Sequence, residues 1–576
     1  MIKGISTDSN KAHQSIAARE VEPNSSRWRV PASIAIGIGA GLGSLVTAIP
    51  RAYSYAANKP LHDRLEKAQA ATLAQSLKIV LQGSERGRTS PSPIRPSVQA
   101  LKIDLVQQGG LKTAPEKKQA DYLAQGAVRI RYTIEKMQRD EFPRGGVQSL
   151  RSDLAALMNN PLYRKLKNAD SAAINFLQYV AVKLIAVDAN SVLFDFGKEF
   201  LGRSEKEEFS PQELADGMSA YLKKRSFSID HGRLFYSAAH PNKTQRSLMS
   251  VLDPLGYDAS VGNPTFSAHS FELGKKKMNF YYGPGPTGNP IFEHGVLPAY
   301  RKFGVFELRF NFQNTRDKAE ALRVREMVRI ADANSDVLKH AVLGFDTKMD
   351  MTKFDSVDSF FDAYIAFVKD GLREIRAKDV DNGIYISQEM LSIDQVDNAL
   401  AKAREFCRVM SQNNSHWKQA MSQGPHGKEG MGKTMKLIAD TCLSLSMLYR
   451  SFDEITPEMV ERALDERLDR DLTAIRTSGA CKQNIDRGVV GNIALRLFFR
   501  WASDASPLTN REACEIAGAV IGRAKIAEDR KIMKERYKIL DDFLRFVGSA
   551  PRGVAQAHVL LRGYPASVSS GISQIL

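Results

Sequence analysis

One stretch of the chain, residues 252–312, differs in composition from the sequence around it. Glycine and proline are dense at 283–290, aromatic residues become frequent, and residues 305–312 alternate between apolar and polar side chains. Alternation with a period of two is typical of a β-strand. The rest of the chain mostly carries the apolar spacing of amphipathic helices. The sequence therefore predicts an α+β protein that is predominantly helical and has one β-containing insert.

Several helices are marked by their ends as well as by their apolar spacing. The spacing predicts helices around Leu150–Met158 and Ser171–Val187. Ser392 and Gln395 form a capping-box pattern, which predicts a helix through Met410. Thr456 and Pro457 fit an N-cap residue followed by proline in the first helical position. Helices are therefore expected on both sides of the insert.

The composition excludes several classes of protein. Of the 576 residues, 43% are hydrophobic and 25% are charged, as in an ordinary globular protein. A disordered chain, a collagen and a polytopic membrane protein are thereby excluded. The net charge of +16 favours an anionic partner, which is nucleic acid, an acidic membrane surface or a phosphorylated ligand. The four cysteines form no Cys-x-x-Cys pair, which argues against a disulfide framework or a zinc ribbon.

The chain is expected to have three parts. Residues 1–82 form an N-terminal arm, residues 83–98 form a linker rich in proline and serine, and residues 99–576 form the main region, with its core at about 245–505. The arm contains an apolar run, residues 31–50, with the pattern Gly39-x-x-x-Gly43. This run is marginal in length for a membrane span, and its glycines weaken a helix in water. Membrane insertion and a glycine-rich buried or partner-bound segment both remain open.

The segment with most chemical content is the Cys-x5-Arg pattern from Cys481 to Arg487. A thiolate attacks phosphorus in line, while the equatorial oxygens need hydrogen-bond donors. Five residues wrap their backbone N–H groups around one phosphate, and the arginine adds a bidentate fork. An apolar helix is predicted over Val489–Trp501, so its N-terminus would face the same phosphate and favour the thiolate. The alternative is a buried cysteine near a helix start, with a surface ion pair between Asp486 and Arg487.

Cys481, Lys482, Asp486 and Arg487 stand in the order Cys-Lys-x-x-x-Asp-Arg. This loop resembles that of the bacterial secreted effector phosphoinositide phosphatases, the SopB/IpgD and SidF-like group. Upstream, residues 310–314 (FNFQN) resemble an Asn-Phe-x-x-Asn type motif of the same group. The resemblance implies a secreted effector in a host cell, associated with host membranes or in the cytoplasm. It would remove a phosphate, with the 3-position favoured, from phosphoinositide lipids through a phosphocysteine and without a cofactor.

The resemblance also assigns roles to individual residues. Cys481 would be the nucleophile, Arg487 the phosphate clamp, and Lys482 the contact to a second inositol phosphate. The other loop positions would line the substrate, and they are Gln483, Asn484, Ile485 and Gly488. Gly488 departs from the family pattern, because many family loops have Thr or Ser there to help the thiolate leave. The hydroxyl of Thr477 or Ser478 is a candidate substitute.

The general acid that protonates the leaving inositol oxygen has two candidate origins. Asp486 stands in the loop itself. Asp253 and Asp258 lie ahead of the Gly/Pro-rich stretch and are candidates for an acid on a separate loop. Geometry decides between these arrangements, and the sequence leaves both open.

Two further groups are candidate substrate contacts. Asn311 and Asn314 would orient the catalytic loop or bind the inositol, and the alternative is capping of a helix that starts near Thr315. Lys275, Lys276 and Lys277 form a basic run beside aromatic residues, which suits a phosphorylated headgroup at a membrane surface. The alternative for this run is a solvated basic turn.

Residues 427–434, from Gly427 to Thr434, satisfy the phosphate-binding loop pattern G-x4-G-K-[ST] with Lys433 as its lysine. A nucleotide-binding protein is therefore an alternative function, but residues 413–424 are polar and do not supply the buried strand that this motif needs. A glycine-rich approach to an apolar helix at Met435–Tyr449 is the competing interpretation, in which Lys433 still helps to bind an anionic headgroup.

Other chemistries have less support in the sequence. The ten histidines show no metal-ligand spacing, so no metal is expected. Nucleic-acid binding would rest on net charge alone, and no nucleic-acid partner is expected. A non-enzymatic basic module that binds a membrane or a host protein remains the second alternative to the phosphatase.

Overall fold

The structure is a computed structural model of the 576-residue chain. It describes residues 63–77, 97–139, 141, 146–187, 189–201, 207–224, 253, 255, 258–259, 267–273, 276–313, 318–344, 349–375, 384–386, 390–453, 455, 475–481, 484–528 and 531–562. All of these belong to one compact unit, Asn58–Asp230 with Gln245–Leu576. Residues 1–57 and 231–244 form a second unit, which lies outside the described residues.

A six-stranded sheet forms the centre of this unit, in the order β2-β3-β7-β4-β5-β6. Its strands are β2 (Ser267–Leu273), β3 (Lys276–Tyr282), β4 (Glu307–Asn311), β5 (Leu338–Leu343), β6 (Ile384–Ile386) and β7 (Ile475–Ala480). The four inner strands run parallel, and β2 and β6 are antiparallel at the two edges. The last strand along the chain, β7, therefore lies between β3 and β4. A separate antiparallel pair joins β1 (Glu208–Phe209) to β8 (Leu508–Thr509).

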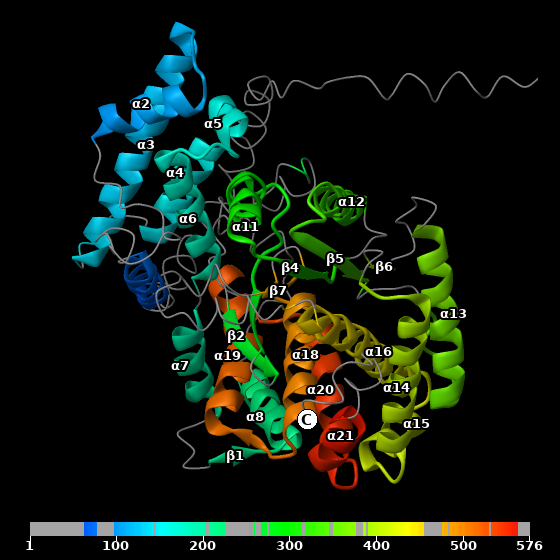
Figure 1. The fold of residues 1–576 in the computed structure, drawn as a ribbon. Helices are drawn as coiled ribbons and strands as arrows, with labels where there is room; N and C mark the ends of the chain where they lie inside the picture. The colour runs from blue at the N-terminus through cyan, green and yellow to red at the C-terminus, as the bar shows by residue number, and fades with distance from the viewer. Residues whose placement is uncertain are drawn as a thin grey trace, which may run out of the picture. The chain divides into compact units, whose positions relative to one another are not determined.

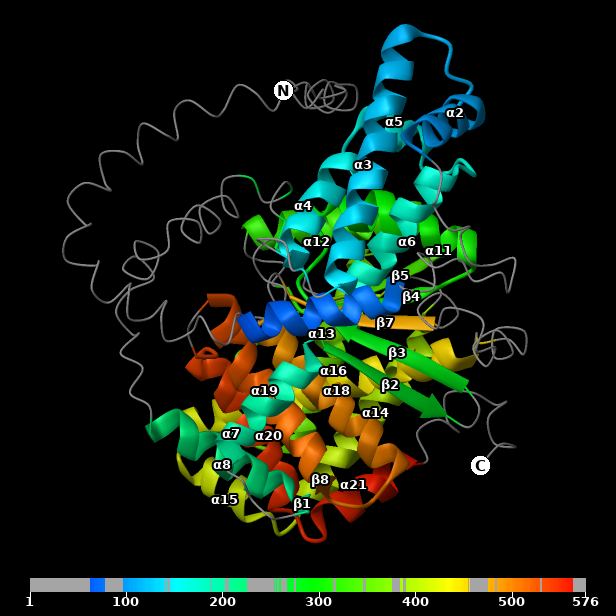
Figure 2. The same ribbon diagram turned by 90° about the vertical axis from the view of Figure 1, so that its left-hand side faces the viewer.

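Helices cover both faces of the sheet (Figures 1 and 2). The helices toward the top of Figure 1 are α2 (Val98–Gln108), α3 (Ala114–Gln138), α4 (Gly146–Met158), α5 (Pro161–Leu166), α6 (Ala172–Ala186), the π-helix η1 (Ile291–Val296), α11 (Leu297–Phe303) and α12 (Lys318–Ala333). The helices below and beside the sheet are α7 (Asn190–Leu201), α8 (Pro211–Lys224), α13 (Val357–Ile375), α14 (Ile393–Ser411), α15 (Ser415–Ser422), α16 (Pro425–Asp453), α18 (Arg487–Ser503), α19 (Asn510–Glu528), α20 (Lys534–Gly548) and α21 (Gly553–Arg562).

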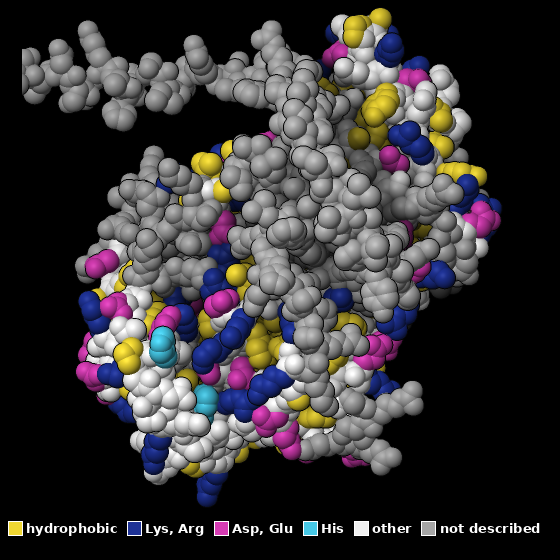
Figure 3. All heavy atoms as spheres, turned by 180° about the vertical axis from the view of Figure 1, so that it is seen from behind, with side chains coloured by type: hydrophobic (Ala, Val, Ile, Leu, Met, Phe, Trp, Pro, Cys, Tyr) yellow, Lys and Arg dark blue, Asp and Glu magenta, His cyan; other side chains and the backbone are white. Residues whose placement is uncertain are grey.

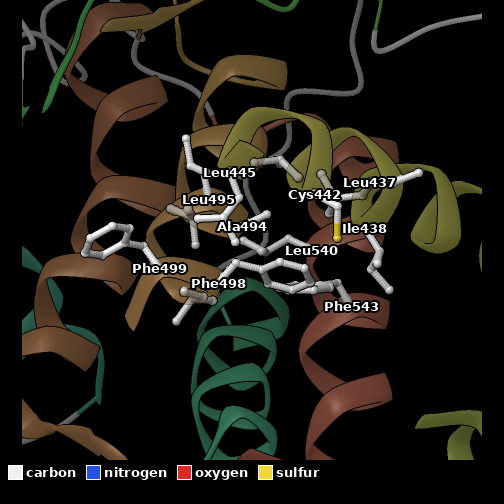
Figure 4. Packing of buried hydrophobic residues seen from close by; sticks show 14 of the residues in the cluster. Leu437, Ile438, Cys442, Leu445, Ala494, Leu495, Phe498, Phe499, Leu540 and Phe543 are labelled. Atoms are coloured by element: carbon white, nitrogen blue, oxygen red, sulfur yellow. The ribbon is translucent and has the colours of Figure 1, made fainter. Parts of the chain in front are cut away.

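Two large hydrophobic cores result from this layering. The larger one joins the lower face of the sheet to α16, α18 and α20, where Leu437, Phe498 and Phe543 interdigitate (Figure 4). The second core lies among the upper helices and has α6 near its centre. Burying one large apolar side chain contributes roughly 1.5–3 kcal/mol, so these cores are the main source of stability. The stretch Ala172–Leu201 is long and apolar enough to cross a membrane, but it is mostly buried, as in a core helix.

The coarse prediction of an α+β protein, mostly helical with a small sheet, is confirmed. The prediction that the β-structure forms one insert is corrected, because β5, β6 and β7 lie beyond residue 312 and complete the same sheet. The strand predicted within 305–312 is β4, but both of its faces are buried. Its polar face carries Glu307, whose Oε1 accepts a hydrogen bond from Ser478 Oγ at 2.5 Å.

The helix predictions at α4, α6 and α14 are confirmed, and α14 has the reciprocal capping box of Ser392 and Gln395. The apolar run at 31–50 and the helix start at Thr456 lie outside the described residues. Most of the predicted linker 83–98 is also outside them, but Ser97 caps α2 by accepting from Ala100 N at 3.3 Å. Residues 63–77, within the predicted arm, are helical and bury Leu73 and Leu77 in the second core.

Candidate active site

Cys481 lies at the carboxyl end of β7, one of the two central strands of the sheet. It directly follows β7, and its side chain is buried. The backbone oxygen of Ala480 accepts from Phe312 N at 2.8 Å, and that of Cys481 accepts from Gly285 N at 3.2 Å. Phe312 follows β4, and Gly285 belongs to the Gly/Pro-rich stretch after β3. The thiol-bearing residue is therefore held between the segments that leave the two neighbouring strands.

This end of the sheet is a topological switch point. The helix that follows β4 in the chain is α12, which lies on the upper side, whereas β7 leads directly into α18 on the lower side (Figures 1 and 2). Neighbouring parallel strands whose helices leave toward opposite faces open a crevice at their carboxyl ends, and ligands of α/β sheets bind there. Cys481 follows one of the two strands that border this position.

Asn484, ahead of α18, packs against Gly488, the second residue of that helix. Asn484 is buried and has a positive φ of 55°, which asparagine tolerates better than most residues. A Cβ atom on Gly488 would overlap the end of the Asn484 side-chain amide and would approach the backbone nitrogen of Cys481 to 2.9 Å. Glycine at this position is therefore a packing requirement of the turn. This accounts for the departure from the Thr or Ser of the resembling loops.

Asn492, one turn further along α18, fixes the helix against the strand. Its Nδ2 donates to the backbone oxygen of Gly479 at 3.2 Å. A Cβ atom on Gly479 would overlap the Asn492 side chain, so the absence of a side chain at Gly479 lets the helix approach the strand. The buried contact sets the start of α18 directly behind Cys481. Ile485, also buried, packs with Ala524 and Ala527 of α19.

Arg487 is the first residue of α18 and pairs with Glu320 of α12. The pair is mostly shielded, because the side chains are 13% and 16% exposed. It joins the two helices that leave the switch point toward opposite faces. The contact engages one terminal nitrogen of the guanidinium, so the carboxylate fixes the direction in which Arg487 extends.

Asp486 is the N-cap residue of α18, but its side chain bonds elsewhere. Its Oδ1 accepts from the backbone nitrogen of Met533 at 2.9 Å, which brings the start of α20 to the loop.

A cavity of about 470 Å³ lies between this part of α20 and α16. Its lining has three cations, on Lys433, Lys436 and Arg536, and four carboxylates, on Asp350, Glu429, Asp440 and Glu535. Lys433 pairs with Glu429 on its own helix.

One charged residue of this region, Arg523 on α19, was not predicted from the sequence. Its side chain is 1% exposed. With the Asn484 amide oxygen turned toward it, Arg523 Nη1 donates to that oxygen at 2.6 Å. The signal in the sequence is that Arg523 lies within a run of small and apolar residues. A cation in a buried helix needs a specific partner, so this pattern indicates a buried polar contact.

The alternative general acids lie in different surroundings. Asp253 is exposed. Asp258 interacts electrostatically with Arg151 of α4, a buried residue whose Nη2 donates to the Leu184 backbone oxygen at 2.7 Å. Of the three candidate acids, Asp486 is the one within the loop that joins Cys481 to α18.

Asn311 ends β4 and is paired in register with Ala480, the residue before Cys481. Its Oδ1 accepts from Gln313 N at 2.9 Å, so it shapes the chain that leaves β4. The alternative, capping of a helix near Thr315, does not describe this contact, since α12 begins at Lys318. Asn314 lies outside the described residues, as do Lys275, Lys482 and Gln483.

Lys276 and Lys277 are the first residues of β3, whereas Tyr282 at its other end is in register with Gly479. At about 3.3 Å per residue, the backbone of the two lysines lies some 20 Å from that end. Their predicted contact with the substrate is therefore not part of the site around Cys481. Their predicted contact with a membrane surface stays a prediction.

The structure does not form the phosphate-binding loop that the pattern at residues 427–434 predicts. Residues 427–434 lie within α16, which begins at Pro425 and follows helix α15. In a helix the N–H groups bond to the preceding turn, so this segment has no loop in which they converge on a phosphate. A Cβ atom on Gly427 would overlap the backbone oxygen of Ala420, so this glycine serves the packing of α15 against α16.

The remaining cysteines have a structural character. Cys407 and Cys442 are buried in the larger core, and burial raises the pKa of each thiol well above its usual range. Burial also raises the pKa of Cys514, whose Sγ donates to Asn510 Oδ1 at 3.1 Å. In the part of the chain that the structure describes, no three His, Cys, Asp or Glu side chains are grouped to hold a metal ion.

No family model matches the chain, and neither a curated protein nor a solved structure matches it.

Proposed function

We propose that the protein is a cysteine-dependent phosphatase that acts on phosphoinositides. The observation that carries the proposal is the position of Cys481. It stands at the carboxyl end of a central parallel strand, at a switch point and six residues before the arginine that begins α18. A strand, a tight turn and a helix N-terminus in this order direct N–H groups and a positive dipole at one small volume, which suits a phosphate.

The proposed reaction has two steps. The Cys481 thiolate attacks phosphorus and forms a phosphocysteine, while the bond from phosphorus to the inositol oxygen breaks and Asp486 gives that oxygen a proton. Arg487 and the N–H groups of the turn bind the equatorial oxygens. Water then attacks the phosphocysteine, Asp486 takes its proton, and inorganic phosphate leaves as the thiolate re-forms. Cys481, Asp486 and Arg487 are sufficient for this sequence, and the proposal assigns it no metal or cofactor.

The substrate class follows from the resemblance and from charge. The loop resembles those of effector phosphoinositide phosphatases. The net charge of +16 favours attraction to an acidic membrane. The proposal therefore includes polyphosphorylated phosphatidylinositols as substrates, with the 3-phosphate favoured, and a secreted protein that acts at host membranes.

The test is phosphate release by the full-length chain from a panel of short-chain phosphoinositides and soluble inositol phosphates. We expect release by the wild type and a loss of at least a hundredfold in Cys481→Ser, with the fold checked by circular dichroism. Cys514→Ser is the matched control, because it replaces another buried thiol and keeps an atom that donates to Asn510.

Two results would contradict the proposal. One is an absence of release from every substrate, in which case lipid binding that is equal in wild type and Cys481→Ser would support the non-enzymatic basic module. The other is equal release by wild type and a folded Cys481→Ser, which would remove the cysteine from the chemistry.

A further inference from the structure

The inference concerns the cavity of about 470 Å³ between α16 and α20. Residues 349–352, which precede α13, supply a third part of its lining. A volume of this size lies within the range of about 300–1,000 Å³ that is usual for small-molecule sites. The described residues of the segment 481–488 are not part of the lining. The cavity is therefore a candidate binding site separate from the one around Cys481.

Two buried charged side chains contribute to this lining. Lys436 and Asp440 lie one turn apart on α16, and Lys436 Nζ lies 2.6 Å from Asp440 Oδ2. Their side chains are only 5% and 6% exposed. The hydroxyl group of Tyr364, on α13, donates to the other carboxylate oxygen, Asp440 Oδ1. The removal of such a pair from water is costly unless further hydrogen bonds satisfy both charges.

The hydrogen bonds of this pair leave donors and acceptors unused. An ammonium group has three N–H donors, and a carboxylate has about four acceptor sites. Within the described part of the chain, Lys436 Nζ donates to Asp440 alone. The carboxylate of Asp440 accepts from Lys436 and Tyr364. Because Lys436 and Asp440 both line the cavity, a ligand with an anionic oxygen and N–H donors would satisfy the two together.

The other charges of the lining restrict the kind of ligand. Four carboxylates stand against three cations, which opposes a ligand with negative charges only, such as an inositol phosphate. Lys433 is already paired with Glu429. Among the described residues, no three His, Cys, Asp or Glu side chains are grouped to hold a metal ion. The charges therefore fit a small ligand that carries groups of both signs.

The apolar part of the lining comes from Met349, Met351, Leu437 and Ile539. Methionine side chains adapt to the shape of what they contact. We propose that this cavity binds a free α-amino acid with an apolar side chain. Such a molecule carries its ammonium and its carboxylate on one carbon atom, so the two groups lie close together, as Lys436 and Asp440 do.

In this arrangement, Lys436 donates to the carboxylate of the amino acid, and Asp440 accepts from its ammonium group. The apolar residues of the lining contact its side chain. The inference goes beyond the proposed function and does not depend on Cys481.

The test is isothermal titration calorimetry of the full-length chain with leucine, methionine and phenylalanine. We expect saturable binding with a Kd of about 1 mM or lower. Leucinamide lacks the carboxylate and N-acetylleucine lacks the ammonium group, so each should bind at least tenfold more weakly than leucine. Glutamate should also bind at least tenfold more weakly, because its second carboxylate would meet the apolar part of the lining.

A triple variant with Lys436→Met, Asp440→Leu and Tyr364→Phe replaces the polar side chains by apolar ones of similar size. Replacement of a complete buried pair is often neutral for stability, whereas removal of one partner leaves an unpaired charge. We therefore expect the triple variant to fold and to bind leucine at least tenfold more weakly than the wild type.

The matched control replaces another lysine–aspartate pair. Lys369 Nζ lies 2.8 Å from Asp397 Oδ2 and joins α13 to α14, and neither residue lines the cavity. The double variant with Lys369→Met and Asp397→Leu should keep the wild-type affinity for leucine.

Three results would overturn the inference. The first is an absence of saturable binding by the wild type with all three amino acids at up to about 10 mM. The second is equal affinity of the wild type for leucine, leucinamide and N-acetylleucine. The third is a folded triple variant that binds leucine as the wild type does. If the triple variant does not fold, the two derivatives decide, because they are measured on the wild type.

Discussion

At the scale of single residues, the turn after Cys481 makes a demand on Gly488 that can be tested. A Cβ atom there would overlap the end of the Asn484 side-chain amide, so Gly488→Ala must displace the start of α18 or Asn484. We expect the rate of phosphate release to fall at least tenfold and the free energy of unfolding to fall by about 1–3 kcal/mol. Steady-state assays and urea unfolding measure the two quantities.

Gly430→Ala in α16 is the control for this substitution. Its added Cβ would meet only the ends of the Asp542 and Lys538 side chains, at 3.0 and 3.4 Å. These ends are able to shift, and alanine is favoured over glycine in a helix by about 1 kcal/mol. The control should therefore keep its stability and activity. A fully active Gly488→Ala would show that the turn has room for a side chain.

The same residues show what local sequence predicts and what it does not. The spacing from Cys481 to Arg487 could be recognised in the sequence because both residues belong to one short continuous segment. The pairing of Arg487 with Glu320 and the approach of Arg523 were not, because each joins elements far apart in sequence. In the sequence, Gly488 stands out because the resembling loops often have Thr or Ser at this position. The reason for a glycine, the close approach of the Asn484 side chain, depends on the folded structure.

At the scale of elements, helix ends were predicted better than strands. The box of Ser392 and Gln395 satisfies backbone donors locally, so its signal needs no tertiary context. Strand β7 (IRTSGA) has no apolar alternation, because Gly479 admits Asn492 and Ser478 bonds to Glu307. Apart from Ile475, its residues are small or polar, and their contacts are with elements distant in the sequence. A strand of this kind is not recognised from its own six residues.

The crossing of α7 and α19 makes a second prediction at this scale. A Cβ atom on Gly518 would overlap the backbone oxygen of Leu193, and one on Gly197 would overlap that of Cys514, so the two helices touch through glycine. Gly518→Ala forces them apart and should lower the free energy of unfolding by about 1–3 kcal/mol.

Urea unfolding checks this prediction, with Arg511→Ala as control. Arg511 is exposed at the start of α19 and pairs with Glu515 at 3.1 Å, a surface contact worth less than about 1 kcal/mol. A Gly518→Ala variant as stable as this control would mean that the helices have room to separate.

At the scale of the whole molecule, the sheet between the two cores positions the candidate site. The carboxyl ends of β3, β4 and β7 lie at the same edge of this sheet. The basic net charge is not gathered there. On the described part of the face in Figure 3, Lys and Arg side chains lie among Asp and Glu side chains. Many surface cations are paired, as Arg301 is with Asp336 at 2.6 Å. Basic and acidic side chains are thus mixed on this described part of the surface.

Buried histidines make the stability of the whole molecule depend on pH. Burial lowers the pKa of His340, on β5, to about 3, and that of His294, in η1, to about 4. Both are neutral in the folded protein at pH 5.5, whereas unfolded histidine, with a pKa near 6.5, is mostly protonated there. The unfolded chain binds more protons, so stability falls as the pH falls below about 6.5.

The loss for each such histidine approaches about 1.4 kcal/mol per pH unit down to its folded pKa. Urea unfolding at pH 7.5 and 5.5 measures the total. His340→Gln cannot gain a proton on unfolding, so its difference between the two pH values should be smaller by about 1 kcal/mol. His426→Gln, which changes an exposed residue of α16, should leave the wild-type difference unchanged. An unchanged difference in His340→Gln would mean that the β5 imidazole is able to charge inside the folded sheet.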